Sequence, residues 1–263
     1  MNPKAFKKKL VEEIINSVRI IPAPLRDALL KAGEEAQGPE KIVLQKLVEN
    51  SSAASDFNVP VCQDTGIFEI WFIIGKDADI RGMDFSSLAD EALKEAHVKG
   101  SLRESMPGGV RGSVHISFSP GRELKTIISP RGFGSENYTF LHSLNPPAGE
   151  EEIKKAVIDD IKKAAGKPCP PYVIGIGHGG TASAAVNLSA FALSNINYSP
   201  SGFEKEILDE VNKLGHGAGA VGGKFSALGI KIESMPAHIA GLQLCVHVGC
   251  WCNRVRKFCY EEN

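Results

Sequence analysis

The sequence predicts an α+β protein, a single compact mixed domain with a helical N-terminal segment. Apolar residues recur at helical spacing through the opening, about residues 1–55, and shorter runs rich in β-branched and aromatic residues follow it. No internal repeat, low-complexity tract or linker-like stretch interrupts the chain. We therefore expect one domain over residues 1–263, with the helical opening packed onto it.

Two prolines divide the opening into helices. Pro22 and Pro24 stand between the first two apolar runs, and proline breaks a helix when it falls inside one. A third run follows before residue 50. The recurring apolar positions of the three expected helices are Phe6, Leu10, Ile14, Ile15 and Val18, then Leu25, Leu29 and Leu30, then Val43, Leu44, Leu47 and Val48.

After Pro60 the pattern changes to a mixture of strands and helices. The run from Ile67 to Ile74 is short, apolar and rich in β-branched residues, which predicts a buried strand. Residues 86–99 return to helical spacing, with Ser86 as the expected N-cap. Two alternating runs flank a Pro120-Gly121 turn and predict a β-hairpin. The remaining expectations are the hairpin strands at 114–119 and 124–129, a helix at 150–165, a strand at 172–176, a helix at 182–193, and a glycine-rich stretch at 214–229 that curls closely around another group.

The bulk composition excludes several classes of function. A formal net charge of -1 and a pI of about 6.7 provide no long-range field that would gather nucleic acid or an anionic membrane. No stretch approaches the roughly 18 apolar residues that span a bilayer, and the Lys-rich start lacks the apolar region of a signal peptide. We therefore expect a cytoplasmic protein that binds neither nucleic acid nor membrane.

Six cysteines carry most of the chemical information, and two of them lie alone in loops. In a cytoplasmic chain they argue against a disulfide framework and leave metal binding, redox chemistry or plain burial. Cys62 precedes the first buried strand in Pro60-Val61-Cys62-Gln63-Asp64-Thr65-Gly66, where polar groups can converge on a ligand. Cys169 lies between prolines that restrict its backbone. The alternatives are an ordinary turn at the first segment and a rigid loop with an incidental thiol at the second.

The other cysteines are crowded near the C-terminus around His247. A zinc site is one interpretation, but no second cysteine knuckle exists upstream of Cys245, Cys250 and Cys252. The compact run of four cysteines that holds many electron-transfer clusters is also absent. Three cysteines from distant loops would leave one iron of a cluster open to act as a Lewis acid. A non-catalytic or redox metal protein that uses the C-terminal cysteines is the alternative of another class.

Six segments follow one another in an order that is informative as a set. They are Cys62 to Gly66, Gly132 to Asn137, Cys169 to Tyr172, Gly175 to Thr181, Gly222 to Lys224, and His238 to Ala240 followed by Cys250. In this order the chain resembles the α-type, cluster-binding part of class I fumarases and L-tartrate dehydratases. The resemblance covers almost the whole chain beyond the helical opening, and six ordered motifs are far more specific than any one.

The resemblance implies a 4Fe-4S cluster with one open iron site. Cys62, Cys169 and Cys250 fall where the three cluster ligands of the family lie. The thiols left over are those of Cys245, Cys252 and Cys259.

The resemblance also implies roles around the substrate. Gln63 and Asp64 match residues that touch substrate, and Asp64 is a candidate proton donor to the leaving hydroxyl. Arg103 matches an arginine that binds a substrate carboxylate, Gly134 a glycine whose backbone approaches the substrate, and His238 a histidine implicated in catalysis. The alternatives are that Arg103 caps the preceding helix and that His238 is a buried core residue.

The implied reaction is the reversible hydration of a small dicarboxylate, fumarate to malate in the first instance. L-tartrate and mesaconate are alternative substrate types. The choice of substrate stays open because His178 interrupts a turn that in many relatives consists of hydrophobic residues and glycine. In the family the proton-abstracting base belongs to a β-type domain. Because the chain ends at Asn263, soon after Cys250, we expect a separate β-type subunit and a heterotetramer of two α-type and two β-type chains.

Overall fold

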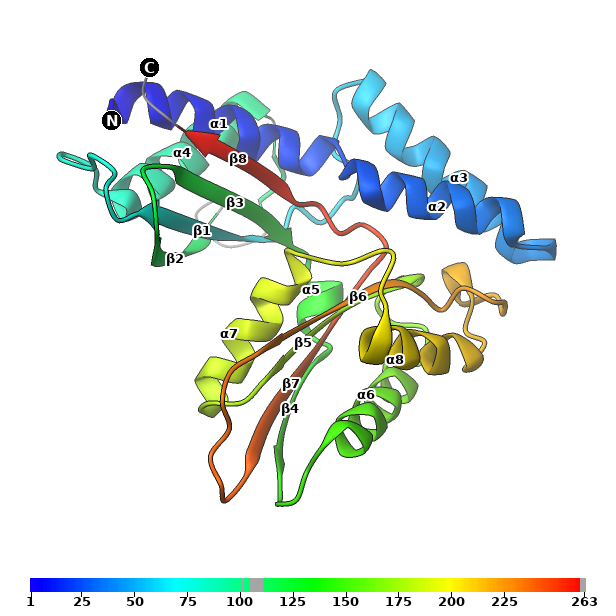
Figure 1. Ribbon diagram of the computed structural model, residues 1–263. Helices are drawn as coiled ribbons and strands as arrows, with labels where there is room; N and C mark the ends of the chain where they lie inside the picture. The colour runs from blue at the N-terminus through cyan, green and yellow to red at the C-terminus, as the bar shows by residue number, and fades with distance from the viewer. Residues whose placement is uncertain (101, 105–110, 261–263) are drawn as a thin grey trace. The chain divides into compact units, whose positions relative to one another are not determined.

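The computed structural model describes residues 1–100, 102–104 and 111–260, and the chain forms two compact units (Figure 1). Unit 1 contains Met1–Pro22, Ser51–Phe133 and Arg254–Asn263, and unit 2 contains Ala23–Asn50 and Gly134–Asn253. Each unit has its own four-stranded sheet and its own hydrophobic core, which confirms the α+β class. Because each unit collects segments that are far apart in the sequence, no linker marks the boundary between them.

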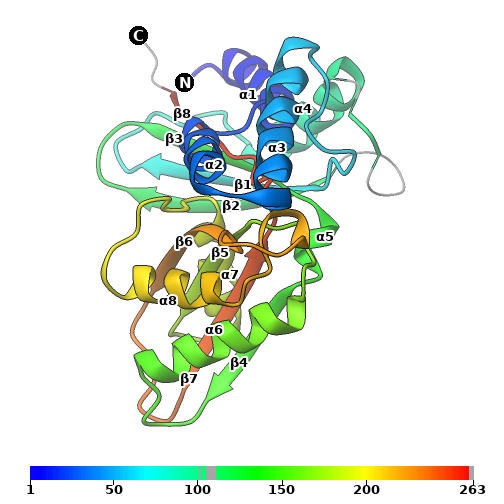
Figure 2. The ribbon, with the colours of Figure 1, turned by 90° about the vertical axis from the view of Figure 1, so that its right-hand side faces the viewer.

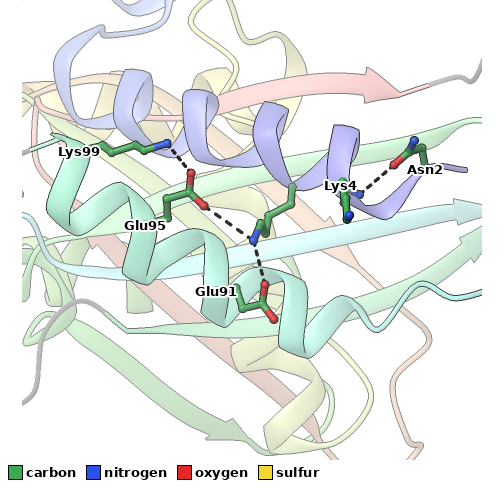
Figure 3. Close-up of polar contacts among 6 residues, drawn as sticks. Asn2, Lys4, Glu91, Glu95 and Lys99 are labelled. Carbon is green, nitrogen blue, oxygen red and sulfur yellow. Dashed lines mark hydrogen bonds and ion pairs between the residues drawn. The ribbon is translucent and has the colours of Figure 1, made fainter.

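The helical opening is confirmed as three helices. They are α1 (Pro3–Arg19), α2 (Ala23–Glu35) and α3 (Gly38–Asp56). The Asn2 side chain caps α1 by accepting hydrogen bonds from the backbone N–H groups of Lys4 and Ala5. Figure 3 shows the contact with Lys4. Among the described residues, no helix is both long enough and apolar enough to cross a membrane.

Unit 1 is built on a sheet with the strand order β2-β1-β3-β8. The helices α1 and α4 pack their apolar side chains against the core of this sheet. On the surface, Lys7 Nζ of α1 lies 3.0 Å from Glu91 Oε2 and 3.8 Å from Glu95 Oε2 of α4 (Figure 3). The elements are β1 (Ile67–Gly75), α4 (Phe85–Gly100), β2 (Gly112–Ser119), β3 (Leu124–Arg131) and β8 (Arg256–Tyr260).

The predicted hairpin between β2 and β3 is wrong, because β1 lies between the two strands. β1 pairs in parallel with β2 and antiparallel with β3. Phe72 and Trp71 of β1 point to opposite faces of the sheet and both are buried, as expected of a central strand. The Pro120-Gly121 turn passes around the end of β1, where Asp77 N–H donates to Gly121 O at 3.0 Å. The local turn pattern indicated the reversal of the chain but not the strand inserted within it.

The predicted N-cap Ser86 is also wrong. The helix α4 begins at Phe85, and Asp84 caps it. Its backbone carbonyl accepts a hydrogen bond from Leu88 N at 2.9 Å, and its side chain accepts from Ser87 N at 3.1 Å. A carboxylate is as good an acceptor as a hydroxyl at this position, and it also interacts favourably with the helix dipole.

Unit 2 is built on a sheet with the strand order β4-β7-β5-β6. The helices α6 and α8 supply the core on one face, and α7 covers the other (Figures 1 and 2). The predicted helices at 150–165 and 182–193 and the strand at 172–176 are confirmed. The elements are α5 (Phe133–Glu136), β4 (Thr139–Leu144), α6 (Glu150–Ala164), β5 (Tyr172–His178), α7 (Ala182–Leu193), α8 (Gly202–Lys213), the 3-10 helix η1 (Ala218–Ala220), β6 (Ala227–Ser234) and β7 (Leu242–Gly249).

The cap of α4 provides a test of the corrected boundary. We expect Asp84→Ala to lower the thermal unfolding midpoint of the apoprotein, because Ser87 N–H loses its acceptor. Hydrogen bonds from the backbone and then the hydroxyl of Ser87 hold the pKa of Asp84 below its ordinary value. Such a carboxyl stabilises the fold above its unfolded-state pKa, and the contribution is lost as pH falls through the folded-state value.

The difference in thermal unfolding midpoint between wild type and Asp84→Ala should therefore stay constant from about pH 7 to about pH 5. It should shrink below about pH 4. Ser86→Ala is the control, and it should melt like wild type. If circular dichroism during heating shows the unfolding midpoint lowered equally in the two variants, the assignment of Asp84 as the cap is contradicted.

Candidate functional site

The first set of predicted site residues lies in unit 1, in the loop between α3 and β1. Val61 N–H donates to Val18 O at 2.9 Å, which anchors the loop on the end of α1. Gly66 has a positive φ of 82°, and a Cβ there would lie 2.2 Å from Arg131 O, so the loop presses closely against the end of β3. Cys62 and Asp64 are partly exposed in this loop, and Gln63 is exposed.

Asp64 is oriented by the turn that follows β3. Its Oδ2 accepts a hydrogen bond from Phe133 N at 2.8 Å. The same oxygen lies 3.0 Å from the position that a Cβ on Gly132 would occupy, so a side chain there would crowd the carboxylate. The glycine of this turn therefore leaves room for Asp64, and one carboxylate oxygen is held while the other is not used by this contact.

A pocket of about 330 Å³ surrounds these groups. It is lined by Gln63, Asp64, Arg103, Glu104 and Phe133. The pocket is lined by one cationic group and by carboxylates, and it is large enough for a small dicarboxylate. Of its lining residues, Glu104 and Phe133 were not singled out from the sequence; Phe133 lies within the Gly132 to Asn137 motif, whereas no signal pointed to Glu104.

Arg103 contributes to this pocket, and among the described residues it donates to no carbonyl of α4. Its Nη1 donates to Gln63 O at 3.4 Å. The carbonyl of Gly100, the last residue of α4, instead accepts from Arg19 Nη2 at 3.0 Å. The capping alternative for Arg103 is therefore wrong, and its exposed guanidinium retains donors for an anion.

The second set of predicted residues lies in unit 2, at one end of its sheet. β5 and β7 are antiparallel neighbours, and Val173 at the start of β5 pairs with Gly249 at the end of β7. Cys169 precedes β5 and Cys250 follows β7, so the register brings their loops together. Trp251 N–H donates to Cys169 O at 3.2 Å.

Gly134 and Ser135 of α5 belong to the same end of unit 2. Ser135 Oγ accepts a hydrogen bond from Cys250 N at 3.1 Å. Gly134 is exposed, its φ is not positive, and a Cβ there would meet no atom within 4 Å. The packing of the described residues therefore does not require a glycine at this position.

The accessibility of the thiols separates the six cysteines. Cys62 and Cys250 are partly exposed, Cys169 and Cys259 are exposed, and Cys245 and Cys252 are buried. Cys245 accepts a hydrogen bond from Ser189 Oγ at 3.1 Å beneath α7, and burial raises the pKa of its thiol, which disfavours a metal-binding thiolate.

The zinc alternative finds little support in these positions. His247 is buried on the same face of β7 as Cys245, and its Nε2 lies 3.0 Å from Glu136 Oε1. Across residues 1–100, 102–104 and 111–260, no three His, Cys, Asp or Glu side chains converge as they would on one metal ion. A cluster distributes its thiolates over separate irons, so its ligands need not converge in that way.

His238 lies at the other end of the unit 2 sheet. It is exposed in the loop between β6 and β7, where its Nδ1 accepts from Ala240 N at 3.1 Å, and so the buried-core alternative is wrong. The eight residues of β7 separate this loop from Cys250, a distance of roughly 25 Å along a strand. Within one unit 2, His238 and the two cysteines therefore cannot contact the same small molecule.

The glycine-rich turn from Gly175 to Thr181 also lies toward the His238 end. Met235 N–H donates to His178 O at 3.1 Å, and burial lowers the pKa of the His178 side chain. Gly175 and Gly177 have a packing role, because a Cβ at either would lie within 2.4 Å of a backbone carbonyl oxygen of α7. These glycines allow close contact between the helix and the sheet, so no phosphate loop is needed to explain them.

Comparisons with known proteins identify the family. The family model described as fumarate hydratase (Fumerase) matches residues 8–258. The chain is 34% identical over 270 residues, 93% of its length and 94% of the relative's, to a Methanocaldococcus jannaschii protein provisionally named L(+)-tartrate dehydratase subunit alpha. It is 26% identical over 278 residues to the L(+)-tartrate dehydratase subunit alpha of Escherichia coli strain K12, covering 96% of this chain and 91% of that one. The chain therefore belongs to the fumarate hydratase family, among the α-type chains of class I fumarate hydratases and tartrate dehydratases, and it is a hydro-lyase.

Proposed function

We propose that this chain is the cluster-binding subunit of a 4Fe-4S hydro-lyase that reversibly hydrates a small dicarboxylate, with fumarate and malate as the first pair to assay. The observation that carries the proposal is the placement of Cys169 and Cys250 on adjoining loops, tied by the hydrogen bond from Trp251 N to Cys169 O. The relatives' names make L-tartrate an equally suitable second candidate.

The donor set suits the proposed cluster. Cys62, Cys169 and Cys250 are the cysteines of the resemblance, all three have accessible thiols, and thiolate sulfur is the usual ligand of iron-sulfur clusters. Cys62 belongs to unit 1 and the other two to unit 2, so their union in one site is part of the proposal. When bound, a cluster held by three thiolates supplies an open iron as a Lewis acid for the substrate hydroxyl and carboxylate.

The remaining chemistry falls to the residues of the unit 1 pocket. Arg103 would bind a substrate carboxylate through its fork of donors, and Gln63 would contact the substrate beside it. Asp64, held through Oδ2 by Phe133 N, would deliver a proton from its other oxygen to the leaving hydroxyl. Gly134 would allow the backbone to approach the far carboxylate. This orientation reduces the entropic part of the barrier.

A β-type partner would complete the reaction. The relatives are themselves named as alpha subunits, which supports a partner for this chain as well. The partner would supply the base that removes the C3 proton. The heterotetramer of two α-type and two β-type chains is the assembly that we propose.

The cysteine assignment can be tested by counting iron. After anaerobic reconstitution, Cys62→Ser, Cys169→Ser and Cys250→Ser should each lose most of the iron and sulfide, because each removes a thiolate ligand. Cys259→Ser, which changes an exposed thiol on β8, is the matched control and should bind a full cluster. The proposal fails if Cys62→Ser and Cys169→Ser keep wild-type iron, or if the wild type paired with a β-type subunit converts none of fumarate, L-tartrate and mesaconate.

Gly134→Ala tests the approach of the substrate to the backbone. Because a methyl group would meet no protein atom within 4 Å, the variant should unfold at the wild-type temperature and bind a full cluster. The methyl group should instead obstruct the substrate and lower kcat/KM by about 10-fold or more, as misplacement at a reacting centre does. Gly149→Ala, which is also unstrained and lies outside the site, should leave kcat/KM unchanged. Wild-type kcat/KM for Gly134→Ala would remove this glycine from the site.

We propose that His238 is supplied to the site by a second α-type chain. Within one unit 2 it is roughly 25 Å from Cys250, while two α-type chains in one assembly could bring them together. Cys250→Ser and His238→Asn chains should each be inactive with the β-type subunit.

Co-expression of the two variant chains should restore about a quarter of wild-type activity, since half of randomly mixed pairs are hybrid and each hybrid has one intact site. Mass spectrometry would show whether hybrid assemblies have formed. If they have formed and activity is not restored, a second chain does not contribute His238.

A further inference from the structure

Glu40, on the first turn of α3, is buried in unit 2 and holds a loop together. Its side chain is 3% exposed. The carboxylate accepts hydrogen bonds from three backbone N–H groups, those of Ala218 at 3.2 Å, Lys224 at 2.9 Å and Phe225 at 2.8 Å. Hydrogen bonds to an ionised acceptor are about twice as strong as neutral ones, so this contact is a strong constraint on residues 215–225, here called the Glu40 loop.

The Glu40 loop is shaped to close around this carboxylate. A Cβ on Gly223 would lie 2.3 Å from Glu40 Cδ, and a Cβ on Gly217 would lie 2.4 Å from the backbone of Gly222. Both glycines have positive φ values. The glycine-rich stretch therefore curls around another group as predicted, and that group is a carboxylate from the helical opening.

The Glu40 loop leads directly to Cys169. Ala218, whose N–H is bound by Glu40, is followed by Gly219, whose N–H donates to Pro170 O at 2.8 Å. The neighbouring carbonyl, that of Cys169, accepts from Trp251 N at 3.2 Å. Two consecutive carbonyls of the Cys169 loop therefore accept hydrogen bonds. That of Pro170 is bound by the Glu40 loop, and that of Cys169 is bound by Trp251, the residue after Cys250.

Packing strengthens the same connection. A Cβ on Gly219 would lie 3.0 Å from Val43 Cγ1 of α3, so Val43 supports the Glu40 loop one turn after Glu40. Lys224 also contacts Glu35 of α2, but that pair lies on the surface and side chains of this kind contribute little. The buried carboxylate of Glu40 and the half-buried side chain of Val43 are thus two supports that α3 gives to this loop.

We propose that Glu40 is a positioning residue for the cluster ligand Cys169, a role that rests on the proposed function. α3 would then act on the site although none of its residues is a predicted ligand. Outer groups that orient metal ligands typically change metal affinity by about 10- to 100-fold when they are removed. Glu40→Gln places an amide NH₂ against backbone N–H donors, and it should loosen the Glu40 loop and with it Pro170 and Cys169.

The experiment uses the full chain, paired with its β-type subunit where it is co-expressed, and two readouts. The first is the rate at which a chelator removes iron from the reconstituted protein, expected to rise about 10-fold or more in Glu40→Gln. The second is hydrogen exchange of the apoprotein, which should become faster at Gly219 and Trp251. Glu35→Gln, which breaks only the surface pair with Lys224, should match wild type in both.

A further control separates positioning from general loss of stability. Ile207→Val truncates a fully buried side chain of α8 in the same unit, away from the Glu40 loop. It should release iron at the wild-type rate. The proposal is overturned if Ile207→Val and Glu40→Gln release iron equally fast, or if Glu40→Gln releases it at the wild-type rate.

The proposal can still be tested if Glu40→Gln does not fold or if the protein binds no cluster. If Glu40→Gln does not fold, Val43→Ala keeps the carboxylate and should show the same changes to a smaller degree; wild-type behaviour of Val43→Ala would then count against the proposal. If no variant, including wild type, binds a cluster, the proposed function fails, and hydrogen exchange at Gly219 and Trp251 alone decides whether Glu40 holds the Cys169 loop.

Discussion

The antiparallel pairing of β5 with β7 is the constraint on which the candidate site depends. Its register places the beginning of β5 beside the end of β7, and so it sets Cys169 and Cys250 on adjoining loops. The same pairing sends the β6–β7 loop, with His238, to the opposite end of the sheet. One ladder of hydrogen bonds therefore places Cys169 and Cys250 at one end of the unit 2 sheet and His238 at the other.

Several hydrogen bonds to backbone groups hold the loops at the cysteine end. Trp251 N–H, Gly219 N–H and the Ser135 hydroxyl each hold a backbone group of a cysteine-bearing loop. In unit 1, Asp64 is held by Phe133 N, and only Gly134 separates Phe133 from Ser135 in the chain. Catalytic groups gain most when they are fixed before the substrate arrives. Glu40 would extend this principle to the loop behind Cys169.

Much of the fold follows from local patterns, and what does not is non-local. The helices α1 to α4, α6 and α7 and the strands β1 and β5 show their periodicity in sequence. The pairing of β2 and β3 with β1 was mispredicted, because the turn between β2 and β3 is compatible with a hairpin or with an inserted strand. The strands β4, β6 and β8 and the helix α8 were not predicted. β4 and β8 are short, and such strands gain stability mainly from neighbours distant in sequence.

The site shows the same division. Cys62, Cys169, Cys250 and Asp64 were predicted through ordered motifs and Arg103 through the family resemblance, whereas the accessibility of these residues and the strand register emerged only from the fold. Glu40 could not have been found from spacing, since it contacts residues at separations such as 178 positions along the chain. From the sequence, the helix that contains Glu40 was interpreted as part of a packing layer. A carboxylate that will be buried cannot be told from the other polar residues of a helix by local pattern.

The central claim is a cluster held by three thiolates with one iron open to substrate. Mössbauer spectroscopy of the reconstituted protein, enriched in ⁵⁷Fe and paired with its β-type subunit, tests it most directly. We predict four irons per α-type chain, one of which changes its quadrupole splitting when a substrate dicarboxylate is added while the other three do not. A spectrum of four thiolate-bound irons that does not respond to fumarate, L-tartrate or mesaconate would contradict the account.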